Sequence, residues 1–295
     1  MRAFGSAFVF VTVVLAWPTD RRVASAPAVE QTFRVATFNI HKGSDRRGRY
    51  NLERTIDVIH RLNVDLVGVQ EAMRNHPAFA CDNQPARIAE GLRQRTGRPW
   101  THVQAKAWIT ADRHCVASGR GSGVATEDLA IISASPIVAS SVVRLSEGRI
   151  GLAVRVAAMP HVPVVVTHLA ANRENRHHRI QELSVLLPWA ARHGPGLLIG
   201  DLNAQPDTEE LRPVLARYRD AWAAAAAAGR IAGVLSGSTR PGRRVSRIDY
   251  VLYDPRLDLT LGSVETVDVS ADSEWGEVSD HHPVVATFRR NTEKS

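Results

Sequence analysis

The chain has 295 residues, of which 44% are hydrophobic and 23% are charged, and its formal net charge at pH 7 is +7. This length and apolar content suffice for a full hydrophobic core, and one large domain is favoured because no linker rich in Pro, Gly or Ser divides the chain. Beyond the N-terminal segment no apolar stretch approaches the length of a bilayer span, which excludes a membrane-spanning body.

The positive charge comes almost entirely from arginine. A basic chain attracts phosphate-rich partners, but a general bias of the composition toward Ala and Arg explains the same charge. Charge therefore indicates a phosphate-containing partner only if residues at a site support it.

The N-terminal segment has the pattern of a secretory signal peptide over residues 1–26. An apolar stretch runs from Ala3 to Trp17, and small residues follow at positions 24–26. The rest of the chain, with a domain expected over residues 31–290, is therefore predicted to be secreted or periplasmic. Pro27 disfavours cleavage directly before it, so the alternative is an uncleaved leader that anchors the protein to the membrane.

Short runs rich in Val and Ile, bounded by turn residues, predict a protein with many β-strands. In chain order the expected strands are Phe33–Asn39, Leu66–Gln70, Leu129–Ser133, Val138–Leu145, Gly151–Val156, Val164–His168, Leu197–Gly200, Ile248–Leu252, Ser263–Val269 and Val284–Phe288.

Between these strands lie segments with the spacing of amphipathic helices. The first follows the candidate N-cap Asn51, and others are expected after Pro85, from Ile180 and near Thr208; the alanine run at 223–228 is expected to extend a surface helix. Helices and strands mix without strict βαβ alternation. The pattern favours a four-layer α/β sandwich, with two stacked, mostly antiparallel sheets flanked by helices, over a doubly wound sheet.

The chain has two cysteines, Cys81 and Cys115, in irregular polar stretches. In an exported protein one disulfide is the economical interpretation, and neither residue lies in a nucleophile motif. The alternative is a pair of free thiols, because the bond requires Cα atoms within about 7 Å.

Polar side chains gather at the ends of the predicted strands, where a rigid apolar run delivers them to solvent. Taken singly they have ordinary explanations: Asn39 as a turn residue, His168 as a core histidine, Asp249 as a partner of Arg247. Taken together they supply oxygen ligands of the kind that Mg²⁺ accepts and histidines that titrate near neutrality. That set suits phosphoryl chemistry, in which cations and donors must surround the phosphorus.

The order and wording of these segments resemble the endonuclease/exonuclease/phosphatase superfamily, which includes pancreatic-type deoxyribonuclease, abasic-site endonucleases, inositol-phosphate 5-phosphatases and bacterial sphingomyelinases. The resemblance extends from about Phe33 to Phe288 and implies a metal-dependent phosphoesterase that uses water as the nucleophile. It is carried by Phe38-Asn39, Gln70-Glu71, Thr167-His168-Leu169, Gly200-Asp201-Leu202-Asn203-Ala204, Arg247-Ile248-Asp249-Tyr250 and Ser279-Asp280-His281-His282-Pro283.

The resemblance also implies the metal site. Glu71 would be the principal ligand of Mg²⁺, with Mn²⁺ or Ca²⁺ as alternatives, and Asn39 and Asp280 would complete or orient the ligand set.

The same resemblance assigns the catalytic residues His168, Asp201, Asn203, Asp249 and His281. Asp249 would orient His281, whose imidazole contacts the scissile phosphate or its water. Asp201 would position the attacking water, and Asn203 would donate to a phosphate oxygen. His168 would stabilise the transition state or protonate the leaving oxygen. The choice of general base between Asp201 and His281 stays open, and His282 is expected to be structural.

The expected partner is a phosphate-containing substrate, either nucleic acid or a phospholipid or sphingolipid headgroup, and the protein is expected to be a monomer without a transmembrane partner. Arginine clusters at 173–179 and 240–247 adjoin the predicted site and favour an anionic substrate, although a solvated positive face has the same pattern. The alternatives are a phosphomonoesterase for inositol-type phosphates and a noncatalytic anion-binding surface module of the same fold.

Overall fold

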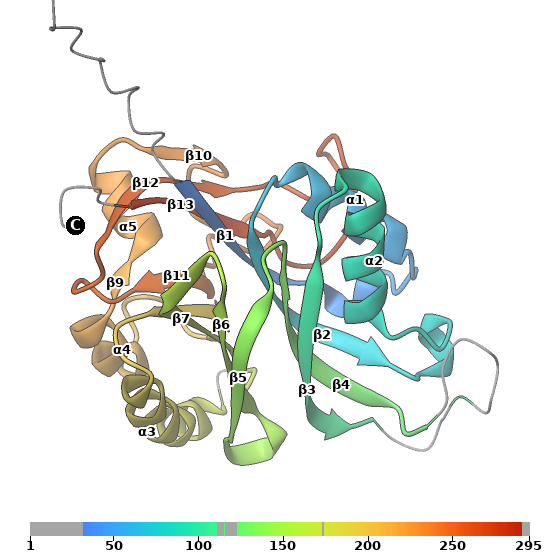
Figure 1. Ribbon diagram of the computed structural model, residues 1–295, viewed down its shortest axis with the longest axis horizontal. Helices are drawn as coiled ribbons and strands as arrows, with labels where there is room; N and C mark the ends of the chain where they lie inside the picture. The colour runs from blue at the N-terminus through green and yellow to red at the C-terminus, as the bar shows by residue number, and fades with distance from the viewer. Residues whose placement is uncertain (1–31, 111–114, 116–122, 173, 291–295) are drawn as a thin grey trace, which may run out of the picture. The chain divides into compact units, whose positions relative to one another are not determined.

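The computed structural model describes residues 32–110, 115, 123–172 and 174–290, so the predicted signal peptide lies outside the described residues. Two sheets stack face to face, and helices cover both outer faces (Figure 1). The expected four-layer α/β sandwich is confirmed. No helix among the described residues is long and apolar enough to cross a membrane.

One sheet has seven strands and contains both the first and the last strand of the described chain. Two neighbouring pairs, β1 with β2 and β10 with β12, are parallel, and the other neighbours are antiparallel. In spatial order the strands are β10 (Ile231–Gly233), β12 (Leu259–Thr266), β13 (Val284–Arg290), β1 (Thr32–Asn39), β2 (Leu66–Arg74), β4 (Thr126–Ser133) and β3 (Thr101–Ile109).

The other sheet has six strands, of which only the neighbours β7 and β8 are parallel. In spatial order the strands are β5 (Ile137–Arg144), β6 (Ile150–Val156), β7 (Met159–His168), β8 (Leu197–Asp201), β11 (Asp249–Tyr253) and β9 (Arg219–Asp220). Both sheets are therefore mostly antiparallel, as predicted.

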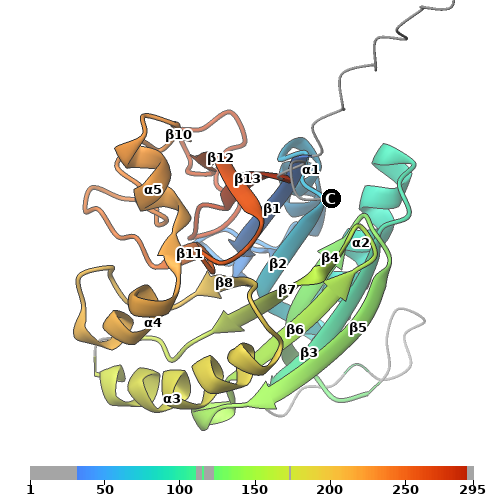
Figure 2. The same ribbon diagram turned by 60° about the vertical axis from the view of Figure 1, so that its left-hand side comes forward.

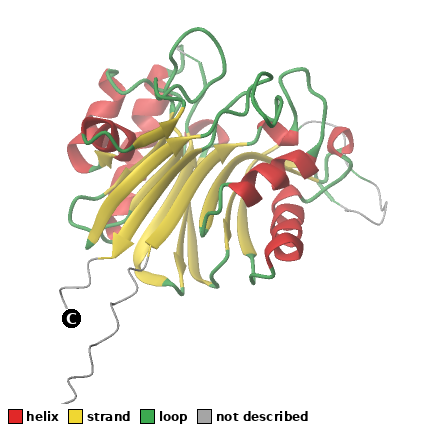
Figure 3. Ribbon diagram, turned by 90° about the horizontal axis from the view of Figure 1, so that it is seen from above, coloured by secondary structure: helices red, strands yellow, loops and turns green. Residues whose placement is uncertain are grey.

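Helices cover the outer faces of the two sheets, and Figure 3 shows them on both sides of the strands. Helices α1 (Leu52–Arg61) and α2 (Gln84–Thr96) pack on the seven-stranded sheet, whereas α3 (Arg176–Arg192) and α4 (Arg212–Arg217) pack on the six-stranded sheet. Helix α1 begins as predicted, because the side chain of Asn51 accepts a hydrogen bond from the backbone N–H of Arg54.

The alanine run does not extend a neighbouring helix but forms most of a separate one, α5 (Ala221–Ala227), which Figure 2 shows beside β11 and β12. Ala221 and Ala225 are fully buried in the core between the sheets. The expected surface helix therefore has a buried face. Its Asp220 N-cap accepts from the backbone N–H of Ala223.

The sequence did not predict the strands that lack an apolar run. Strands β3, β9 and β10 were not predicted, and β12 begins four residues before the expected Ser263. Strand β3 interrupts its apolar residues with Gln104 and Lys106 and has little buried surface, so its strand conformation depends on pairing with β4.

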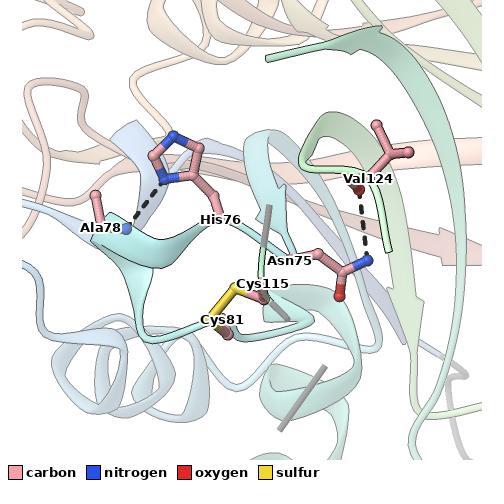
Figure 4. Close-up of a disulfide and its surroundings, with 6 residues drawn as sticks. All are labelled: Asn75, His76, Ala78, Cys81, Cys115 and Val124. Atoms are coloured by element: carbon pink, nitrogen blue, oxygen red, sulfur yellow. Dashed lines mark hydrogen bonds between the residues drawn. A yellow bond between two sulfur atoms is a disulfide. The ribbon is translucent and has the colours of Figure 1, made fainter. Parts of the chain in front are cut away.

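The predicted disulfide is confirmed: Cys81 and Cys115 are bonded, with their Cα atoms 5.8 Å apart (Figure 4). The bond joins the segment after β2 to the connection between β3 and β4. A backbone hydrogen bond from Cys115 N to Asn75 O supports the same contact.

Gly200 allows β8 to lie close to β7 directly before Asp201. Its φ is +140°, and a Cβ built there would lie 2.0 Å from the carbonyl oxygen of Thr167. We expect Gly200→Ala to destabilise the fold by roughly 3–5 kcal/mol, because strain at φ adds to a clash with backbone that cannot move alone. Urea unfolding of the variant and the wild type measures this difference.

The matched control is Gly229→Ala, which also has a positive φ, +66°, but no atom within 4 Å of the added Cβ. Only the left-handed conformation opposes this change, so we expect a loss of about 1–2 kcal/mol. Equal losses in the two variants would show that the approach of β8 to β7 does not depend on Gly200.

Candidate active site

Strand register brings three predicted catalytic residues together at one end of the six-stranded sheet. Strand β8 lies between β7 and β11, and its last residue, Asp201, pairs with His168 on one side and with Asp249 on the other. Neighbouring strands lie about 4.8 Å apart, so the three side chains share one small region. The pairing explains why residues 33 and 48 positions from Asp201 meet it.

The seven-stranded sheet contributes Asn39 and Glu71 from the adjacent ends of β1 and β2. Asn39 pairs with Gln70, and the pairing of β2 with β4 shifts register between Val69 and Ala72. Glu71 lies in this irregularity with a φ of +55°. Such a bulge redirects a side chain, and the strained backbone at Glu71 is consistent with a functional position.

The side-chain amide of Asn39 connects the two sheets. Its Nδ2 donates to Glu71 Oε1 at 3.1 Å and to Asp201 Oδ2 at 3.2 Å. Its backbone carbonyl accepts from Ser279 Oγ, which also accepts from the backbone N–H of His281. Asn39 is completely buried and thus holds carboxylates of different sheets in a fixed arrangement.

His281 forms a buried pair with Asp249. The distance between His281 Nδ1 and Asp249 Oδ2 is 2.8 Å, and Nε2 lies 3.8 Å from Asp201 Oδ2. Burial lowers the pKa of His281, but attraction by Asp249 and Asp201 outweighs it and raises the pKa to about 10. The imidazole is therefore a cation held between two carboxylates at neutral pH.

Asp201, Asp249 and His281 each offer a ligand atom, and these atoms lie within 4.8 Å of one another. This trio differs from the predicted ligands Asn39, Glu71 and Asp280. The two carboxylates are already charge-paired with the imidazolium, which has no lone pair for a metal. We therefore interpret the trio as a charge-paired group and not as a metal site.

His168 lies on the other side of Asp201, with its Nε2 3.5 Å from Asp201 Oδ2. Burial lowers the pKa of His168 to about 4, so its imidazole is neutral near pH 7. Burial, followed by repulsion from Asp249, raises the pKa of Asp201. The two histidines therefore differ in charge although both contact one carboxylate.

Asn203 follows Asp201 in a left-handed conformation with a φ of +50°. Its backbone N–H donates to Asp201 Oδ1 at 2.9 Å, and its Nδ2 donates to Leu169 O at 3.0 Å. An amide NH₂ has a second hydrogen, so Asn203 retains a donor for a further acceptor.

Two charged residues that the sequence did not assign, Lys42 and Glu127, lie beside Glu71. Lys42 Nζ is 3.2 Å from Glu71 Oε2 and 3.9 Å from Glu127 Oε2. Burial raises the pKa of Glu71, but attraction by His168, which is protonated at the low pH where Glu71 titrates, and by Lys42 overcomes this and lowers the pKa to about 2. Burial and then repulsion by Glu71 raise the pKa of Glu127 to about 8. At neutral pH, Lys42 thus faces one ionised and one mostly protonated carboxyl group.

A cleft of about 850 Å³ opens over these residues. Among the predicted site residues, Asn39 and Asp249 lie behind the cleft wall, where they hold side chains that line it. The predicted residues that line it are Glu71, His168, Asp201, Asn203, Asp280 and His281.

The cleft wall also carries cations, most of which are neutralised. Arg240 donates to Asp280 Oδ2 at 3.2 Å, and Arg179 donates to Glu210 Oε1 at 3.0 Å. Arg149 lies over the ring of Trp108, and its buried Nη1 has no hydrogen-bond partner among the described residues. Arg149 lies in the turn directly before β6, outside the motifs and arginine clusters of the sequence, so no pattern in the sequence predicted it as a site residue.

Fold and site together define a class: an α/β sandwich with an acidic, histidine-containing cleft suited to a cation and an anionic ligand. The chain belongs to the endonuclease/exonuclease/phosphatase family, whose model matches residues 36–281. Members of this family are in general phosphoester hydrolases. Among curated proteins no sequence match was found.

Solved structures share the fold at low sequence identity. An endonuclease/exonuclease/phosphatase from Beutenbergia cavernae is 23% identical, with a TM-score of 0.66 over 88% of this chain and 72% of that chain. The human nocturnin catalytic domain with bound sulfate is 18% identical, with a TM-score of 0.61 over 87% and 93%. A mannosyl-6-phosphatase from Bacteroides thetaiotaomicron is 14% identical, with a TM-score of 0.61 over 87% and 99%.

Proposed function

We propose that the protein hydrolyses a phosphodiester by attack of water, with the help of a divalent metal ion. One observation carries this proposal: the amide of Asn39 contacts Glu71 and Asp201, so the expected metal ligand and the expected catalytic carboxylate share one cleft. Lys42 and the imidazolium of His281 already offset part of the repulsion between these carboxylates, and a bound metal ion would offset it further.

The donor set fits a hard cation such as Mg²⁺, Mn²⁺ or Ca²⁺. Glu71 and Asp280 offer carboxylate oxygens to the cleft, and Asp280 Oδ1 is buried without a hydrogen-bond partner among the described residues. Asn39 orients Glu71, as a residue behind a metal ligand does. When bound, the metal would neutralise charge on a nonbridging phosphate oxygen.

The residues of the chain supply the remaining chemistry. Asp249 fixes the ring of His281, whose Nε2 is directed toward the cleft and contacts the phosphate or its water. Asp201 positions the attacking water and accepts its proton as the new P–O bond forms, and Asn203 donates to a phosphate oxygen. As the other P–O bond breaks, the neutral imidazole of His168 donates a hydrogen bond to the leaving oxygen, which takes up a proton from solvent.

The balance of charge in the cleft favours a substrate with one negative charge at phosphorus. Arg176, Arg179 and Arg240 are paired with acidic residues, whereas Arg149 has an unpartnered donor among the described residues. A diester of nucleic acid or of a phospholipid or sphingolipid headgroup meets this condition better than a multiply charged inositol-type phosphomonoester.

We also propose that the protein is exported. The bond between Cys81 and Cys115 supports this, because disulfides persist in oxidising compartments outside the cytoplasm. The signal-peptide pattern over residues 1–26 leads to the same location.

Removal of metal is expected to abolish hydrolysis and separates an enzyme from a noncatalytic binder. We expect turnover of bis(p-nitrophenyl) phosphate in MgCl₂ to fall to background in excess EDTA and to return when Mn²⁺ or Mg²⁺ is added. The same protein is then assayed on plasmid DNA, RNA, sphingomyelin, phosphatidylinositol and inositol phosphates.

Each outcome decides between the proposals. Activity that survives EDTA would contradict the requirement for a metal. Release of inorganic phosphate from inositol phosphates, with no cleavage of any diester, would favour the phosphomonoesterase. Tight binding of a substrate, with no turnover in the presence of any of the metal ions tested, would identify the protein as a noncatalytic anion-binding module.

A further inference from the structure

We propose that Thr239 is a positioning residue that holds the Asp249–His281 pair together across the two sheets, an inference that rests on the proposed function. Asp249 begins β11 of the six-stranded sheet, whereas His281 precedes β13 of the seven-stranded sheet. Strand pairing within a sheet therefore does not set the 2.8 Å distance between their side chains. Contacts other than the strand pairing of the two sheets must therefore fix the distance between Asp249 and His281.

The hydroxyl of Thr239 holds the Asp249 side of the pair. Thr239 Oγ1 accepts from the backbone N–H of Ile248 at 3.1 Å and from that of Asp249 at 3.2 Å. It donates its proton to Ser246 O at 3.3 Å. A hydroxyl has one hydrogen and two lone pairs, so this one is fully used.

The backbone of Thr239 holds the His281 side. Thr239 O accepts from the backbone N–H of His282 at 2.7 Å, directly after His281, and Thr239 N donates to Ser246 O at 2.8 Å. The next residue, Arg240, donates to Asp280, which directly precedes His281 in the chain. Thr239 is 1% exposed, and it does not line the cleft. One buried residue outside the cleft lining thus binds both chain segments.

Loss of the hydroxyl should loosen this pair and leave the cleft in place. Thr239→Val keeps the shape but removes the acceptor of two buried N–H groups, whereas Thr239→Ser keeps the acceptor. We expect Thr239→Val to lower kcat by about 10- to 100-fold, as changes behind a functional group commonly do, with KM changed less than threefold. Thr239→Ser should retain kcat within about threefold of the wild type.

A second readout does not depend on turnover. The Nδ1–H of His281 is buried, which slows its exchange with solvent, and it is hydrogen-bonded to Asp249. It should therefore give a downfield proton resonance, which is identified by its loss in His281→Ala. We expect Thr239→Val to weaken or shift this resonance and Thr239→Ser to preserve it. In the double variant Thr239→Val/His281→Ala, kcat should fall no further than in His281→Ala alone.

The outcomes separate this inference from the proposed function. If the wild type hydrolyses no phosphoester, the proposed function fails, and the resonance still tests Thr239. The positioning role is overturned if Thr239→Val keeps both the resonance and the kcat of the wild type. It is also overturned if Thr239→Ser loses the resonance and kcat to the same extent as Thr239→Val. Should Thr239→Val not fold, Thr239→Ala removes the same acceptor without adding a methyl group, and the same comparison with Thr239→Ser applies.

Discussion

Replacement of His281 by alanine is expected to lower kcat/KM for the hydrolysed phosphodiester by about 10²- to 10⁴-fold, the range of general acid–base catalysis. The imidazole is held by Asp249, faces Asp201 and lines the cleft. Its removal takes away a positioned cation and proton donor, and it leaves the two carboxylates without the charge between them. Steady-state kinetics on the best diester from the substrate panel measures the loss.

Asp249 acts through His281, so their effects should not multiply. Asp249→Asn alone should lower kcat/KM, but Asp249→Asn/His281→Ala should be close to His281→Ala. His282→Asn is the control, because His282 is also buried but accepts from the backbone N–H of Val269. A loss in His282→Asn as large as that in His281→Ala would remove the special role of His281, as would full activity of His281→Ala.

Replacement of Glu71 by glutamine is expected to weaken Mn²⁺ binding by at least about 100-fold. Substitution of a residue that only orients a metal ligand already lowers metal affinity by about 10- to 100-fold, and Glu71 is the expected ligand itself. The substitution keeps the shape of the side chain and removes its charge. Glu71 is held by Asn39 and Lys42 in a strained backbone conformation, and its side chain lines the cleft. Isothermal titration with Mn²⁺ measures the change, and hydrolysis should fall in parallel.

Glu53→Gln is the control for loss of one negative charge. Glu53 lies on α1, is more than half exposed, and pairs with Arg87 and Arg95 outside the cleft. Its substitution should leave Mn²⁺ binding and hydrolysis unchanged. If Glu71→Gln bound Mn²⁺ as tightly as Glu53→Gln, the metal site would lie elsewhere in the protein.

The sequence by itself determined the layered class of fold and pointed to six of the residues that line the cleft. Apolar runs mark strands whose burial is strong, and such strands end in polar residues that must face solvent or a ligand. Asp201 and His168 were therefore candidates from their places at strand ends, and their roles followed only from the resemblance to the family. The helix start at Asn51 was also recognisable, because capping is a local interaction.

Only the tertiary structure decided which charges surround Glu71 and what holds the site together. Glu127 lies on β4 before the apolar run that marked the predicted strand, and Lys42 and Thr239 lie in segments without periodicity. Lys42 meets Glu127 and Thr239 meets His282, both of which are remote in the chain, and Thr239 also meets Asp249, which is ten residues away. Such contacts depend on strand register and on the stacking of the sheets, which no local pattern of residues records.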